Sequence, residues 1–224
     1  MMKIILYIYY FIRSLYYRGF INTIRLLFYE KTYEKKLGIH THSIVNLDHL
    51  TLAGNNTYEN HHYQGASYDV LFKIFRKLPT GTHHHTFVDY GCGKGRAIFV
   101  AEQCGFTKLI GVDIAQELIE EANENKMNYK PINSFSSIDF VFNDATKYSI
   151  TQDSCIFYFF NPFGATILNK VLENIKESVK QYPRKIYCIY LNPKYKAVFN
   201  ENGFNEIYTM MSKRYTEGII YSLE

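Results

Sequence analysis

Short apolar runs alternate with helical patterns along the chain from Thr86 onward. The apolar runs predict strands at 86–90, 108–113, 139–143, 155–160 and 185–191, followed by a hairpin from Glu206. The stretches between them predict helices at 96–104, 117–126, 165–181 and 193–202. Such alternation is typical of a mostly parallel sheet with helices on both faces. We therefore predict an α/β fold.

The first 38 residues follow a different pattern. Apolar and aromatic residues recur there at helical spacing, at Phe20, Ile21, Ile24, Leu27 and Phe28. They predict an amphipathic helix that ends at Gly38. The uncharged run from Ile4 to Ile12 is nine residues long, whereas a membrane span needs about 20. A polar loop is expected up to Gln64, followed by a helix from Ser67 to Leu78.

Charge is distributed unevenly along the 224 residues, which carry a formal net charge of +4. Residues 1–36 hold seven basic and two acidic residues, whereas the other 188 hold 18 and 19. This balance argues against a nucleic-acid-binding face on the main domain. It leaves two interpretations of the N-terminal helix open. The helix packs against the main domain or a second subunit, or it lies on an anionic membrane surface.

The four cysteines are widely spaced and form no CxxC pair. They predict reduced thiols and a cytoplasmic protein, with membrane association through the N-terminal helix as the open alternative. No residue pattern in the chain predicts a metal site. The oligomeric state has no signature in the sequence.

A glycine-rich turn follows the first predicted strand. Asp89 ends the strand, and Gly91, Gly93 and Gly95 lead into a helix. Glycines at such a turn allow a ligand to approach the backbone closely, and the helix start offers free N–H donors. The second strand ends in Asp113, 22 residues after Gly91, where a carboxylate can accept both hydroxyls of a ribose. Together these residues predict a site for a nucleoside-containing cofactor.

The G-x-G-x-G spacing, with an acid two residues ahead, resembles motif I of the class I S-adenosylmethionine-dependent methyltransferases. Three further segments are similar to the second, third and fourth motifs of that family: GVDIAQEL (111–118), FNDAT (142–146) and FFNPF (159–163). The resemblance divides the chain into a helical, basic and aromatic extension with its loop, 1–62, and a cofactor-binding domain, 63–224. It implies a Rossmann-like sheet of seven strands whose last hairpin is antiparallel.

The resemblance also implies a set of cofactor-binding residues: Tyr63, Gln64, Ser67, Tyr68, Asp89, Gly91, Cys92, Gly93, Gly95, Asp113, Ile114, Asp144, Ala145 and Asn161. Asp113 would bind the ribose, and Ile114 would pack against adenine. Asp144 would accept a hydrogen bond from the adenine amino group. The segment from Tyr63 to Tyr68 would close over the cofactor.

The fourth motif bears on the methyl acceptor. Asn161-Pro162-Phe163 is similar to the Asn/Asp-Pro-Pro-Tyr/Phe of methyltransferases that act on nitrogen, although the second proline is missing here. In those enzymes the Asn oxygen and a Pro carbonyl hold the acceptor N–H groups while an aromatic ring stacks beside them. The resemblance thus implies Asn161, Pro162, Phe163 and Tyr63 as catalytic residues. The expected reaction converts S-adenosylmethionine to S-adenosylhomocysteine and methylates a nitrogen of a protein or small molecule.

Two alternatives stay open. The chain could be a non-catalytic module that binds S-adenosylmethionine or is recruited to a membrane, with residues 1–36 as its working surface. It could also be an NAD-dependent oxidoreductase. The glycine spacing disfavours NAD, because a dinucleotide site has its third glycine one position later.

Overall fold

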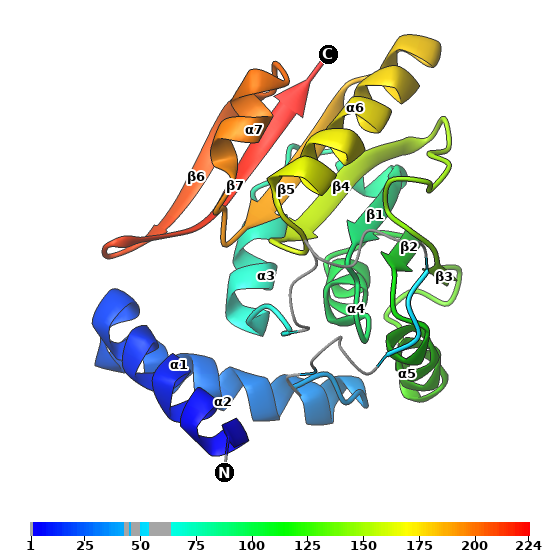
Figure 1. Cartoon of the computed structure of the whole chain (residues 1–224). Helices are drawn as coiled ribbons and strands as arrows, with labels where there is room; N and C mark the ends of the chain where they lie inside the picture. Colours follow the sequence, from blue (N-terminus) through cyan, green and yellow to red (C-terminus); the bar gives the residue numbers. More distant parts are fainter. Residues whose placement is uncertain (1, 43–44, 46–49, 54–63) are drawn as a thin grey trace.

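The computed structural model describes residues 2–42, 45, 50–53 and 64–224. Seven strands form one sheet in the order β3-β2-β1-β4-β5-β7-β6 (Figure 1). The strands are β1 (Thr86–Tyr90), β2 (Lys108–Asp113), β3 (Ser137–Phe142), β4 (Ser154–Phe160), β5 (Ile186–Leu191), β6 (Asn205–Ser212) and β7 (Tyr215–Leu223). The α-helices are α1 (Met2–Arg18), α2 (Phe20–Leu37), α3 (Tyr68–Phe75), α4 (Arg96–Gln103), α5 (Gln116–Asn128), α6 (Ala165–Gln181) and α7 (Lys196–Glu201). The predicted α/β class is confirmed.

One strand, β7, runs opposite to the other strands of the sheet. β7 runs antiparallel to both of its neighbours, β5 and β6, while the other paired strands run parallel. This matches the predicted closing hairpin. The chain adds β2 and β3 on one side of β1 and then returns to add β4 on its other side. The order in which strands are added therefore reverses beside β1. Ligands of open α/β sheets bind at the carboxyl ends of the strands at such a reversal.

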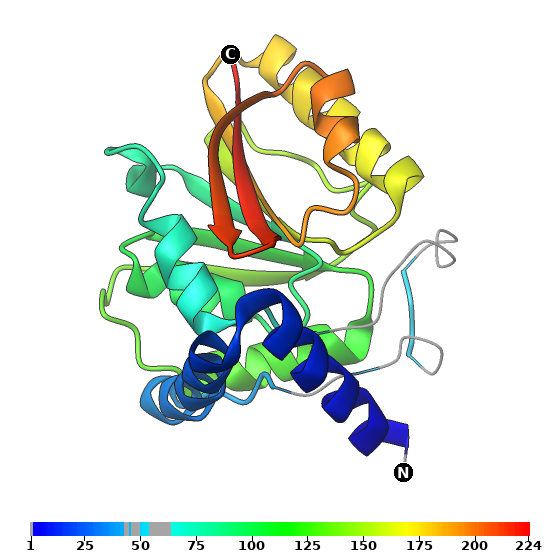
Figure 2. The ribbon, with the colours of Figure 1, turned by 90° about the vertical axis from the view of Figure 1, so that its left-hand side faces the viewer.

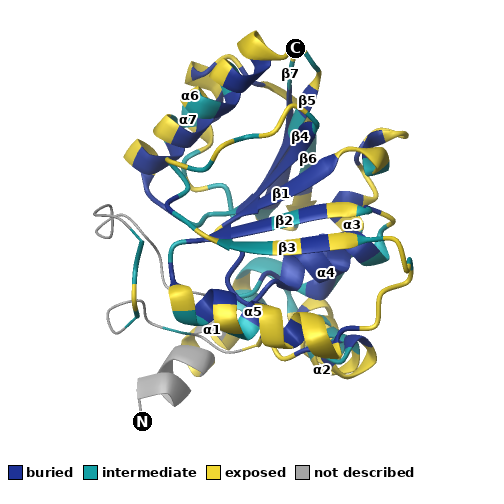
Figure 3. Cartoon of the chain, turned by 90° about the vertical axis from the view of Figure 1, so that its right-hand side faces the viewer, coloured by how far each residue is buried: buried dark blue, intermediate teal, exposed yellow. Residues whose placement is uncertain are grey.

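Helices cover both faces of the sheet (Figure 3). Successive strand residues point to opposite faces, and in β1 Phe87 joins the core under α3 and α4 while Val88 and Tyr90 join the core under α6. All five residues of β1 are buried. The two cores therefore fix β1 from both sides and hold its carboxyl end in place.

The N-terminal segment forms two helices that fold back on each other at one end of the molecule (Figure 2). The predicted amphipathic helix is α2, and it ends at Gly38 in the left-handed conformation, as expected. The sequence analysis did not separate α1 from it. Gly19, with φ +80°, makes the break, and the hydroxyls of Ser14 and Thr23 join the two helices at 2.9 Å. We call α1 and α2 the N-terminal hairpin.

Arg96, the first residue of α4, holds the N-terminal hairpin to the sheet domain. Its side chain is buried, and Nη1 donates to Glu30 Oε2 at 2.6 Å and to the carbonyl of Ala66 at 3.0 Å. Nη2 donates to Glu34 Oε1 at 3.3 Å, and Nε donates to Thr41 Oγ1 at 2.7 Å. One guanidinium thus links α2, the segment after it and the segment before α3 to the helix that follows the glycine turn.

The turn of the N-terminal hairpin also contacts the C-terminal hairpin. Arg18 donates twice to the Glu217 carboxylate, at 2.5 and 2.6 Å. The rings of Tyr17 and Tyr215 lie 5.8 Å apart. The N-terminal hairpin therefore packs against its own domain, as one of the two open interpretations expected.

Replacing Arg96 by Met should lower the free energy of unfolding by about 3 kcal/mol, because Glu30 and Glu34 would lose the cation that compensates their burial. Urea unfolding measures this loss. Arg214→Met is the matched control, since Arg214 is exposed in the β6–β7 turn, and it should change the free energy of unfolding by less than about 0.5 kcal/mol. Equal losses in the two variants would contradict the role given to Arg96.

Candidate functional site

The glycine turn adopts the tight, left-handed backbone that its glycines allow. Gly91, Gly93 and Gly95 have φ values of +79°, +51° and +85°. The N–H groups of Gly91 and Cys92 donate to the carbonyl of Val112 at 2.8 and 3.1 Å, which ties the turn to β2. A Cβ on Gly91 would lie 2.4 Å from Cβ of Pro162. The structure therefore brings the first and fourth predicted motifs into contact.

The two acids at the strand ends lie together behind this turn. Asp113 Oδ2 accepts from the N–H of Gly93 at 2.7 Å, and Oδ1 accepts from the N–H of Ala115 at 3.0 Å. Burial raises the pKa of Asp113, although these backbone N–H groups oppose the shift. Burial, reinforced by the charge of Asp113, raises the pKa of Asp89 well above its usual range.

One oxygen of Asp89 is an unfilled acceptor. Oδ1 of Asp89 is buried and has no hydrogen-bond partner among the residues that the structure describes. A buried polar atom without a partner costs stability and calls for an explanation. A ligand with a cationic or N–H group at this position would satisfy it. The carboxyl ends of β1 and β2 thus carry two buried carboxyl groups, and one oxygen of Asp89 has no partner there among the described residues.

A segment that the sequence analysis treated as loop lies beside the predicted adenine contacts. The N–H of Ala53 donates to the carbonyl of Ile114 at 2.8 Å, and Leu52 forms an antiparallel bridge with Ala115. Its only signal in the sequence is the apolar pair Leu50 and Leu52, which pack on Ala115. The residues 50–53 therefore belong to the surroundings of Ile114, and the sequence analysis missed them.

The third-motif residues lie at the carboxyl end of β3. Asp144 is buried, and its Oδ1 accepts from both the N–H and the hydroxyl of Thr146 at 2.8 Å. Ala145, next to it, is half-buried.

Burial raises the pKa of the Cys92 thiol well above its usual range, so this residue of the glycine turn stays a neutral thiol.

The segment predicted to close over the cofactor divides into parts. Tyr63 lies outside the described residues. Gln64 and Ser67 line a cleft, whereas Tyr68 is fully buried in the core. The Tyr68 hydroxyl lies 3.1 Å from Thr41 Oγ1, and the Arg96 guanidinium lies 4.5 Å from its ring centroid. Tyr68 thus joins the contact with the N-terminal hairpin and does not line the cleft.

The fourth motif turns at Asn161, which has φ +45°. Its Oδ1 accepts from the hydroxyl of Tyr190 at 2.9 Å, which fixes the amide group. Burial raises the pKa of Tyr190 to about 12, so the hydroxyl keeps its proton. Phe163 is 4% exposed and packs edge-on against Phe159 in the core. The aromatic ring that this motif offers to the cleft is that of Phe160, which the sequence analysis did not select.

A cleft of about 690 Å³ lies between the N-terminal hairpin and the carboxyl ends of β4 and β5. Its sheet side is lined by Phe160, Leu191, Asn192, Tyr215 and Glu217. Its other side is lined by Arg18, Leu27, Glu30, Lys31, Glu34, His42, Gln64, Gly65, Ala66, Ser67, Val70 and Arg96. The volume suits a small-molecule ligand. The sequence could not predict this cleft, because five of its 17 lining residues come from the N-terminal hairpin.

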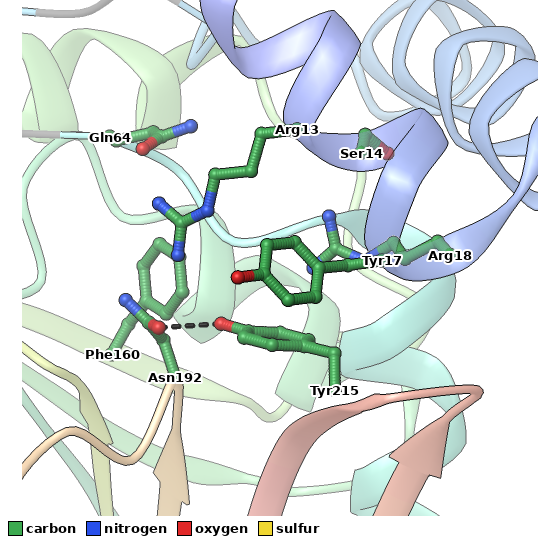
Figure 4. Close-up of a pocket in the computed structure, with 8 residues that line it drawn as sticks. All are labelled: Arg13, Ser14, Tyr17, Arg18, Gln64, Phe160, Asn192 and Tyr215. Carbon is green, nitrogen blue, oxygen red and sulfur yellow. Dashed lines mark hydrogen bonds between the residues drawn. The ribbon is translucent and has the colours of Figure 1, made fainter.

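A smaller chamber of about 120 Å³ adjoins the cleft and shares Phe160, Asn192 and Tyr215 with it (Figure 4). The Asn192 side chain accepts from the Tyr215 hydroxyl. Figure 4 shows the Arg13 side chain extending from α1 toward Phe160. Residues of α1 therefore reach the carboxyl end of β4.

Comparisons with known proteins agree with this geometry. Residues 87–182 match the family described as "Methyltransferase domain". These residues form a methyltransferase domain. They run from β1 through the glycine turn, both buried acids and the fourth motif, so the family resemblance stated above is confirmed. The sequence matches no curated protein.

Solved structures show that the methyltransferase domain and its closing hairpin share the class I methyltransferase fold. An S-adenosylmethionine-dependent methyltransferase from Aquifex aeolicus is 14% identical and covers 70% of this chain and 89% of its own, with a TM-score of 0.53. Magnesium protoporphyrin IX methyltransferase from Synechocystis, solved with bound S-adenosylmethionine, is 15% identical. It covers 69% of this chain and 76% of its own, with a TM-score of 0.50.

Replacing Gly91 by Ala should destabilise the methyltransferase domain more than replacing Gly203 by Ala. Both glycines have φ near +80°, so each substitution costs about 1–2 kcal/mol for the left-handed backbone. A Cβ at Gly203 meets no atom within 4 Å, whereas a Cβ at Gly91 overlaps Pro162. The difference between the two variants in the free energy of unfolding, measured in urea, gives the cost of that overlap. Equal losses of free energy would show that Gly91 is not in close contact with the fourth motif.

Proposed function

We propose that the methyltransferase domain binds S-adenosylmethionine at the carboxyl ends of β1 and β2 and methylates an acceptor held in the neighbouring cleft. The observation that supports this best is the arrangement of the glycine turn around Asp113 and Asp89. Gly91 of the turn is exposed, Asp113 lies behind the turn as a carboxylate for ribose hydroxyls, and one buried oxygen of Asp89 has no hydrogen-bond partner among the described residues. The bound S-adenosylmethionine of the Synechocystis relative supports the same choice of ligand.

The residues present fit this cofactor. Ile114 and the third-motif pair Asp144 and Ala145 would hold adenine, and Asp113 the ribose. Asp89 would face the methionine part, whose amino group is a cation. When bound, the cofactor supplies a methyl group already activated on a sulfonium. The chain's own residues therefore need to align the acceptor and exclude water, which supplies about 7–11 kcal/mol in well-oriented reactions.

We further propose that the acceptor is a nitrogen of a small molecule or of a protein side chain. An amide oxygen has two lone pairs, so Asn161 Oδ1 can accept from an acceptor N–H while it accepts from Tyr190. Phe160 lines the cleft and would place its ring beside the acceptor. The cleft holds a compact ligand or a single side chain, which argues against a folded nucleic-acid duplex.

Asp113→Asn should weaken S-adenosylhomocysteine binding by about tenfold or more, because a neutral amide accepts ribose hydroxyls less well than a carboxylate. For the wild type, affinity should fall as the pH drops through the pKa of Asp113, which burial places above its ordinary value of 3.8. The carboxylate is lost below that pKa, so binding is strongest above it. Calorimetric titration between about pH 8 and pH 5 tests this, and Asp113→Asn should show a flatter pH profile.

Phe160→Ala should lower methyl transfer by about tenfold or more without changing S-adenosylhomocysteine affinity. The assay follows label from S-adenosylmethionine into fractions of a cell extract, and calorimetry follows the affinity. Phe135→Ala is the matched control, because Phe135 is 90% exposed and does not line the cleft. Binding without transfer into any fraction would favour the non-catalytic, cofactor-binding module instead.

A further inference from the structure

One face of the N-terminal hairpin is apolar and exposed. Ten of its large hydrophobic side chains are between 37% and 81% exposed: Ile8, Tyr9, Phe11, Ile12, Tyr16, Phe20, Ile21, Ile24, Leu27 and Phe28. In α1, Ile8, Ile12 and Tyr16 repeat every four residues and so share one side of the helix. In α2 the same holds for Phe20, Ile24 and Phe28. We call these ten residues the apolar face.

Acidic and basic side chains lie on different sides of the N-terminal hairpin. Both acidic residues of the segment point inward, where Glu30 and Glu34 pair with Arg96. The exposed charged residues of the described hairpin are all basic: Arg13, Arg25, Lys31, Lys35 and Lys36. Lys31 and Lys35 continue the helical row that begins with Phe20, Ile24 and Leu27. Arg13 extends toward Phe160 (Figure 4), and the other four cations combine with the apolar side chains on the outer side of the hairpin.

We propose that the apolar face docks on an anionic lipid surface. A helix that lies in a membrane interface combines an apolar side with flanking Lys and Arg, and these are attracted to acidic headgroups. Among the described residues no helix has the length and hydropathy to cross a bilayer, so the hairpin would lie on the surface. Large exposed apolar patches mark interaction sites in proteins. Here the positive charge around the patch favours an anionic partner.

A second copy of the chain fits this face less well. In a two-fold dimer the same patch meets itself, so the four cations of each copy would be brought into one interface with no carboxylate among the exposed residues of the described hairpin to compensate them. Lipid headgroups supply the opposite charge without a matching shape. The cleft also borders this face, since Leu27 and Lys31 belong to the outer side of α2 and line the cleft. Docking would therefore bring the mouth of the cleft to the lipid surface.

Sedimentation with vesicles tests the proposal on the full chain. Wild-type protein should bind vesicles rich in phosphatidylglycerol and not vesicles of phosphatidylcholine alone. Ile21→Asp with Phe28→Asp should abolish binding, while Phe135→Asp, at an equally exposed site elsewhere, should not. Arg25→Glu with Lys35→Glu should weaken binding at least tenfold, since each cation contributes about fivefold. Lys196→Glu, on exposed α7, is its control.

The aspartate pair removes apolar contact, and the glutamate pair reverses charge. If the variant with one pair misfolds, the variant with the other pair still tests the proposal. Thermal unfolding of every variant identifies such a case. Equal binding to both kinds of vesicle, or binding unchanged in both pairs, would overturn the proposal. So would a dimer in light scattering that Ile21→Asp separates while vesicles are not bound. Because S-adenosylhomocysteine plays no part in this assay, its outcome is independent of the proposed methyl transfer.

Discussion

A guanidinium buried directly behind the glycine turn requires negative charge beside it, and in this chain that charge comes from residues far away in sequence. Arg96 follows Gly95 at the start of α4, and its compensating carboxylates are Glu30 and Glu34 of α2. A Cβ on Gly65 would lie 2.7 Å from the guanidinium carbon, so the segment before α3 also passes closely over it. Burying a cation without partners costs several kcal/mol. The N-terminal hairpin is therefore held against the sheet domain because its carboxylates compensate the buried charge of Arg96.

Two consequences follow from that attachment. On its inner side, the hairpin completes a cleft over the carboxyl ends of β4 and β5, with Phe160 on one wall and α2 on the other. On its outer side, the hairpin presents basic and apolar residues, because both of its acidic residues point toward Arg96. The same ion pairs thus shape the proposed acceptor site and the proposed lipid-binding face. This links the segment that carries the surplus positive charge to the chemistry of the domain.

The sheet was predictable because its signals are local. Each strand is a short apolar run, and the helix predicted at 165–181 has the same bounds as α6. The turn at Gly91 was predictable for the same reason, since glycine spacing and the acid that ends the next strand are features of neighbouring residues. The fourth motif was located by the family resemblance of residues 159–163, and the Gly91–Pro162 contact brings it beside the first motif.

Contacts between distant segments were not predictable. Nothing near Arg96 in sequence indicates that Glu30 and Glu34 will pair with it, and the polar composition of 38–64 hides the strand-like contact of Leu52 with Ala115. The side chain that faces the cleft was also assigned three residues too late, to Phe163 instead of Phe160. A motif gives the position of a turn, but the packing of α6 decides which ring enters the core.

We propose above all that the edge of the sheet beside the glycine turn is a site for S-adenosylmethionine. Calorimetric titration of the wild-type chain with S-adenosylhomocysteine and, separately, with NAD tests this most directly. S-adenosylhomocysteine should bind with one molecule per chain, and NAD should give no heat of binding. Preferential binding of NAD would contradict the cofactor assignment, and binding of neither ligand would contradict the site.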